Sequence, residues 1–235
     1  MSESFGLVED KVQEAEFFLE NIRSSGYSSF ESSYFFSAFV SASRSVTFAL
    51  QSCMSGVDDF DEWYENARKT LKVDPLAPYF IEIRNDVVHK GKNPYNRVTL
   101  DHLRETLFHQ FDSDSRAHWL VLPTINNRTR SVLVDAVAAS EAYFTSLLSI
   151  IYDCYSKFRM VVDPQWYFTE EHFYKMGKTL EDGLEELGFP PTWLSGIPES
   201  EAWKVLRRQQ PLCPLNLIFE KYLGRVITAP DEELS

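Results

Sequence analysis

Apolar residues recur at steps of three and four through four long stretches of this sequence, and this spacing constrains the fold more than any other feature. Positions spaced in this way share one face of an α-helix, so each stretch predicts an amphipathic helix. The stretches are 8–23, 28–54, 75–90 and a last one that ends near Phe158. Helices with one apolar face each bury those faces against one another, so we expect an all-α fold built as a helical bundle.

Two short apolar runs interrupt this pattern, Trp119–Leu122 and Ser131–Val134, on either side of Asn126 and Asn127. Their spacing fits either a β-hairpin or an ordered loop that leads into the last long helix, and periodicity does not decide between the two. A further helix is expected from Thr99 to Phe111.

The composition changes after the last long helix. From Asp163 to Glu201 nine acidic residues stand against two lysines, and prolines punctuate the chain. We therefore expect two domains, a helical bundle over residues 1–162 and an acidic, helical C-terminal extension over 163–235.

Charge and cysteine content narrow the classes of function. A net charge of −12 argues against a protein that coats nucleic acid, although a local basic cleft is compatible with it. Cys53, Cys154 and Cys213 are scattered, without the spacing of a zinc site or a disulfide framework. No export signal or membrane-spanning run is recognisable, so we expect a protein of the reducing cytoplasm with no membrane partner.

The most informative polar residues stand at the end of the third long helix. Arg84 and Asn85 are followed by His89, and Gly91 is placed to close the helix in a left-handed conformation. Asn85 and His89 are four positions apart and share a face. A guanidinium, an amide and an imidazole together can hold a phosphate and move a proton near neutral pH. Asp86, three residues before His89, is expected to orient the ring.

Arg84, Asn85 and His89 resemble the R-x4-6-H motif of the HEPN superfamily of helical proteins, in which a polar residue follows the arginine. The resemblance covers roughly the first two thirds of the chain. It implies a HEPN-like bundle, a homodimer whose paired motif helices line a shared cleft, and metal-independent cleavage of RNA. In toxins of this type a tyrosine follows the histidine by two positions and is modified by an antitoxin. Gly91 stands at that place here, and the nearest tyrosine is Tyr95. The resemblance therefore does not extend to an antitoxin that modifies this tyrosine.

Basic residues near the motif predict further contacts with phosphate. Lys90, Lys92 and Arg97 surround it, and Arg44 interrupts the otherwise small-sided surface of the second helix. For Arg44 a solvated position or a structural ion pair is the alternative. His89 could instead cap carbonyl groups, and Arg84 could pair with a neighbouring acid. The small side chains of the second helix would let a neighbouring helix approach closely, either within the core or across a dimer interface.

Two functions follow from these residues. The first is a metal-independent endoribonuclease, a toxin or a defence or stress effector, in which Arg84, Asn85 and His89 act on RNA without a cofactor or metal. The second is a non-catalytic helical module that binds a nucleotide, RNA or a protein, such as an antitoxin or regulatory partner. The remaining histidines lack partners at metal-ligand spacing, and nucleophile and glycine-rich phosphate motifs are absent.

Overall fold

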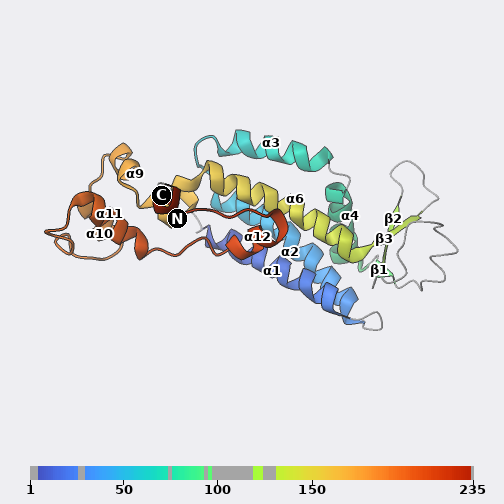
Figure 1. Cartoon of the computed structure of the whole chain (residues 1–235). Coiled ribbons are helices and arrows are strands. Elements are labelled where there is room, and N and C mark those ends of the chain that lie inside the picture. Colours follow the sequence, from blue (N-terminus) through green and yellow to red (C-terminus); the bar gives the residue numbers. More distant parts are fainter. Residues whose placement is uncertain are drawn as a thin grey trace. The chain divides into compact units, whose positions relative to one another are not determined.

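The structure is a computed structural model that describes residues 5–25, 30–73, 76–92, 95–96, 119–123 and 131–233. These residues are mostly helical, which confirms the predicted all-α class (Figure 1). The chain divides into two compact units, Met1–Leu147 and Leu148–Ser235. The division falls within helix α6 (Ala136–Lys157), so the boundary expected near residue 162 lies inside the second unit.

Helices α1 (Gly6–Ser24) and α2 (Glu31–Cys53) lie side by side along much of their length. The predicted stripe of α1 is fully buried, from Val8 to Ile22. The α2 face combines large rings with small residues, which lets its neighbours approach closely. Its buried positions are Ser32, Phe36, Phe39, Val40, Ala42, Ser43, Val46, Thr47, Ala49, Leu50 and Cys53.

Helix α4 (Leu76–Lys90) is held against α2 and α6 by aromatic rings. The Phe80 side chain is 1% exposed and stacks on Tyr143 of α6, with 4.5 Å between ring centroids. Phe36 and Phe39 of α2 meet the same ring at 6.2 and 6.1 Å. Such ring pairs stabilise a core beyond the burial of their area. They fix the face that α4 turns to the core, and therefore the face that it leaves outside.

Helix α3 (Phe60–Val73) packs along α4, and Phe60 and Tyr64 are its buried side chains. A small antiparallel sheet completes the first unit, in the order β1 (Tyr95–Asn96), β2 (Trp119–Pro123), β3 (Ser131–Asp135). The pairing of Leu120 with Val134 shows that the two apolar runs form a hairpin rather than a loop. The helix expected over 99–111 lies outside the described residues.

The second unit continues α6 into short helices: α7 (Arg159–Val162), α8 (Pro164–Tyr167), α9 (Glu170–Lys175), α10 (Leu180–Glu186), α11 (Glu199–Arg208), α12 (Asn216–Leu223) and α13 (Pro230–Glu233). Its core gathers Phe168, Phe173, Leu184, Leu194, Ala202, Trp203 and Leu206. The predicted helical character of the C-terminal region is therefore confirmed. Gly177, with φ +69°, lies between α9 and α10. Thr179 then starts α10 in a capping box with Asp182.

Candidate functional site

The end of α4 is built as the sequence predicts. The helix stops at Lys90, and Gly91 follows with φ +63°. The Lys92 N–H turns back to donate to the Asp86 carbonyl at 3.0 Å. A residue with a Cβ adopts this left-handed conformation only at a cost, which is why glycine is suited to the position. The exposed side chains of the last two turns are thereby held at a defined helix end.

Arg84, Asn85 and His89 come together there. The Arg84 Nη1 lies 3.1 Å from His89 Nε2 and donates to Asn85 Oδ1 at 3.3 Å. A guanidinium only donates, so His89 Nε2 is the acceptor in this contact. His89 is exposed and Arg84 is half-buried. The result is an exposed imidazole with one ring nitrogen next to a guanidinium.

The remaining predicted residues are placed differently. Asp86 pairs with Lys90 at 2.5 Å rather than orienting His89, because residues four apart on a helix meet directly. The expected orienting role of Asp86 is therefore replaced by an ion pair. Lys90 and Lys92 are exposed beside the motif, where they can meet a phosphate. Arg97 lies outside the described residues.

Arg44 is part of a different feature. Its Nη1 donates to Thr47 Oγ1 at 3.1 Å, and its guanidinium carbon lies 4.3 Å from the centre of the Phe48 ring. Arg44 is half-buried rather than fully solvated. It lines a pocket of about 430 Å³ that does not include Arg84, Asn85 or His89, and the phosphate contact predicted for it stays a prediction.

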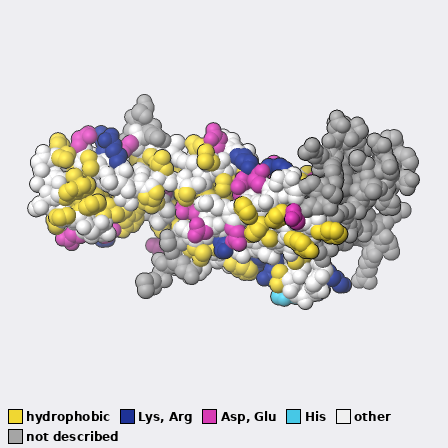
Figure 2. All heavy atoms as spheres, turned by 90° about the horizontal axis from the view of Figure 1, so that it is seen from below, with side chains coloured by type: hydrophobic (Ala, Val, Ile, Leu, Met, Phe, Trp, Pro, Cys, Tyr) yellow, Lys and Arg dark blue, Asp and Glu magenta, His cyan; other side chains and the backbone are white. Residues whose placement is uncertain are grey.

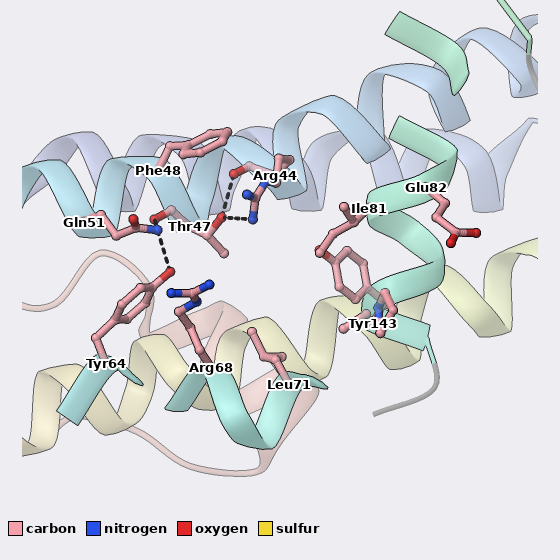
Figure 3. A pocket seen from close by; sticks show the side chains of 12 residues that line it. Arg44, Thr47, Phe48, Gln51, Tyr64, Arg68, Leu71, Ile81, Glu82 and Tyr143 are labelled. Atoms are coloured by element: carbon pink, nitrogen blue, oxygen red, sulfur yellow. Dashed lines mark hydrogen bonds between the residues drawn. The ribbon is translucent and has the colours of Figure 1, made fainter. Parts of the chain in front are cut away.

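This pocket lies between α2, α3, α4 and α6 (Figure 3). One end is polar, with Arg44, Thr47 and Gln51 from α2 facing Tyr64 and Arg68 from α3. The other end is mainly apolar and is bordered by Glu82. Its lining residues are Leu71, Ala77, Pro78, Ile81 and Tyr143. Of the residues at the polar end, the sequence pattern predicted only Arg44 as a functional residue. The available signal was that Arg44 and Gln51 are seven apart and Tyr64 and Arg68 four apart, so each pair shares a helix face.

Tyr64 is the best-defined polar group of the pocket. Its side chain is 7% exposed, and the hydroxyl accepts a bond from Gln51 Nε2 at 2.7 Å. Burial raises the pKa of Tyr64 above its ordinary value, against the opposing effects of the Gln51 bond and of the Arg44 and Arg68 charges. Tyr64 therefore remains a neutral phenol at physiological pH, able to donate its own proton to a ligand.

One face of the described residues is mixed in charge (Figure 2). On the face shown in Figure 2, basic and acidic side chains of the described residues are interspersed, without one broad basic area. Among the described residues no three histidines, cysteines or acids are grouped so that they could hold a metal ion. In the same part of the chain, no helix is both long and apolar enough to cross a bilayer.

Comparison with known proteins finds a likeness over part of the chain. The family model described as Bacteriophage lambda protein ea47 matches residues 24–100. Curated proteins and solved structures gave no match. The matching stretch contains α2, α3 and α4, and with them the motif at the end of α4 and most of the pocket. Because it spans less than half of the chain, it marks a similarity over these three helices.

Proposed function

We propose that this protein is a metal-independent endoribonuclease in which Arg84 and His89 act on one phosphate group of RNA. The observation that carries the proposal is the 3.1 Å contact between Arg84 Nη1 and His89 Nε2 at an exposed helix end. This contact places a permanent cation next to an imidazole, a group that can take up or release a proton. The resemblance of these residues to the HEPN motif supports the same reaction.

RNA supplies its own nucleophile, so the chemistry needs only proton transfer and charge stabilisation. His89 Nε2 takes the proton of a 2′-hydroxyl while the 2′-oxygen bonds to the neighbouring phosphorus and the bond from phosphorus to the 5′-oxygen breaks. Arg84 turns from the imidazole to the phosphate and stabilises the charge that develops on its oxygens. Asn85, which already contacts Arg84, positions the phosphate. The products are a 2′,3′-cyclic phosphate and a 5′-hydroxyl.

The departing 5′-oxygen needs a proton, and one neutral imidazole cannot serve as base and acid at once. We propose that His89 of a second copy, in its protonated form, supplies this proton in a homodimer. The exposure of His89 and Asn85 leaves the motif accessible to such a partner. The activity would be exerted in the cytoplasm, as a toxin or defence effector, with an antitoxin or regulatory protein restraining it.

The test is cleavage of varied RNAs by the purified protein in EDTA. We expect products ending in 2′,3′-cyclic phosphate, and a loss of rate of about a hundredfold or more in His89→Ala and Arg84→Met, typical of removing a group that stabilises the transition state. Val88→Ala is the matched control, because Val88 is the exposed neighbour of His89 at the same helix end. Cleavage that requires Mg²⁺, or that survives in a folded His89→Ala variant, would refute the mechanism.

The non-catalytic binding module remains the second candidate, and the net charge of −12 with its interspersed surface favours it. The net negative charge opposes the binding of long RNA, and any phosphate contact made by Arg84 would weaken as the salt concentration rises. In that case Arg84 and His89 hold a phosphate without turnover. Wild-type protein that retains RNA on a filter while leaving it intact over many hours would select this function over the nuclease.

A further inference from the structure

The pocket between α2, α3, α4 and α6 has features of a ligand site that are independent of the motif. Its volume of about 430 Å³ is within the range of about 300–1,000 Å³ typical of small-molecule sites. It also combines an apolar end with a few converging polar groups, as such sites do. Ile81 of the pocket and His89 of the motif are separated by about 12 Å along the axis of α4. The pocket is therefore a second location on the same helix.

Arg44 is the group that most needs an explanation. Its single hydrogen bond within the described residues goes to the neutral Thr47, and no carboxylate of the described residues lies within ion-pair distance of it. A half-buried charge without a counterion is costly unless something else pairs with it. Thr47 and the Phe48 ring nevertheless hold the guanidinium in place. A bound anion would supply the missing partner for its remaining donors.

The opposite wall provides complementary groups. Arg68 reaches towards the same space from α3, and its bond with Glu65 lies at an exposed surface where such pairs contribute little. The buried Tyr64 hydroxyl accepts from Gln51, and no bond from its own proton to an acceptor is found in the described part of the chain. Two guanidinium groups and a phenol therefore converge from two helices on the polar end (Figure 3).

The apolar end sets the shape of the rest of the ligand. Leu71, Ile81 and Tyr143 come from three different helices and line this end of the pocket. Ile81 is 39% exposed, which is unusual for a large apolar side chain turned towards other apolar residues. A ligand body that covered it would remove this surface from water.

We propose that this pocket binds a small organic anion, in which one phosphate or carboxylate group sits between Arg44, Arg68 and Tyr64 and a compact apolar body contacts Leu71, Ile81 and Tyr143. The arginines recognise the oxygens by paired N–H donors, and the apolar end selects against free inorganic ions. This site does not rest on the nuclease activity.

The experiment is calorimetric titration of the whole protein with phenyl phosphate and with benzoate. We expect dissociation constants on the order of 0.1–1 mM for ligands of this size. Inorganic phosphate, which lacks the apolar body, and phenol, which lacks the charge, should each bind at least about tenfold more weakly. If phenyl phosphate binds more tightly than benzoate, the anion is a phosphate, and the reverse order assigns a carboxylate.

Variants locate the site. Arg44→Met keeps the apolar stem and should weaken the tighter probe about tenfold or more, and Tyr64→Phe should weaken it several-fold. Arg23→Met removes an arginine of α1 outside the pocket and should bind as the wild type does. If Arg44→Met does not fold, Arg44→Lys keeps the charge but loses the paired donors and should also weaken binding. His89→Ala should bind normally, which separates this site from the motif.

Three outcomes would overturn the proposal. They are no binding of either probe up to about 10 mM, equal binding by a folded Arg44→Met or Arg44→Lys variant, and phenol binding as tightly as phenyl phosphate. If the wild type binds the probes but does not cleave RNA, only the nuclease proposal fails. If it cleaves RNA but binds neither probe, only the pocket proposal fails.

Discussion

Replacing Phe80 by alanine should separate the scaffold of α4 from its exposed end. The ring is 1% exposed and contacts Tyr143, Phe39 and Phe36. Truncating a buried phenylalanine to alanine lowers the free energy of unfolding by about 3–5 kcal/mol. The three ring pairs put Phe80→Ala towards the upper part of that range, because each is worth about 0.5–1.5 kcal/mol beyond burial. His89→Ala, at an exposed position, should cost less than about 1 kcal/mol.

Hydrogen–deuterium exchange of the full chain measures how much each substitution destabilises α2 and α4. Every 1.4 kcal/mol is about a factor of ten in an opening equilibrium, so amides of α2 and α4 should exchange a hundredfold to a few thousandfold faster in Phe80→Ala. In His89→Ala the same amides should change by about fivefold or less. The proposed RNA cleavage should fall in Phe80→Ala only as the folded fraction falls, and in His89→Ala without any loss of folded protein.

Two exchange results would contradict these expectations. A change below about fivefold in Phe80→Ala would mean that the ring does not hold α4 in the core. Strongly accelerated exchange throughout α4 in His89→Ala would mean that the histidine is structural, and the nuclease proposal would then fail.

Two further changes test the helix end and the second unit. Gly91→Ala should destabilise the end of α4 by about 1 kcal/mol, because the φ of +63° disfavours a Cβ although the space around it is open; a thermal melt at or above the wild-type value would contradict this. Burial, and secondarily the Lys175 charge, lowers the pKa of His172 below its ordinary value. The unfolded chain then binds its proton first as pH falls, so stability is lost through the ordinary imidazole range. His172→Gln should lose less stability than the wild type between about pH 7.5 and 5 in urea unfolding, and equal losses would refute the linkage.

The local elements followed directly from the sequence. The apolar spacing from Val8 to Ile22 predicted α1, and the glycine after Lys90 predicted where α4 ends. The contact between Arg84 and His89 also depends only on one helix, since side chains five positions apart can meet around its end when one is as long as arginine. Periodicity and helix capping are short-range effects, which is why one chain segment is enough to predict them.

Features that join distant segments could not be read in this way. The sequence left residues 119–134 undecided, because a short apolar run fits several structures until a partner strand is known; β3 supplies that partner. It also placed the domain boundary where the charge changes, near residue 162, whereas the two units divide within α6. A continuous helix can belong to two cores, and composition carries no signal of this.

The sequence by itself therefore determined the helical class, the ends of the long helices and the set of reactive groups at the end of α4. Only the tertiary structure decided that Arg44 faces Tyr64 and Arg68 across a pocket, because nothing in the spacing of α2 or α3 states which faces of the two helices meet. The hydrogen bond from Gln51 to Tyr64 joins these two faces, and the packing of the rings of Phe36, Phe39, Phe80 and Tyr143 fixes the orientation of α4 against α2 and α6. Side-chain packing acts between segments far apart in the chain, and it is specified by the shape of the whole core.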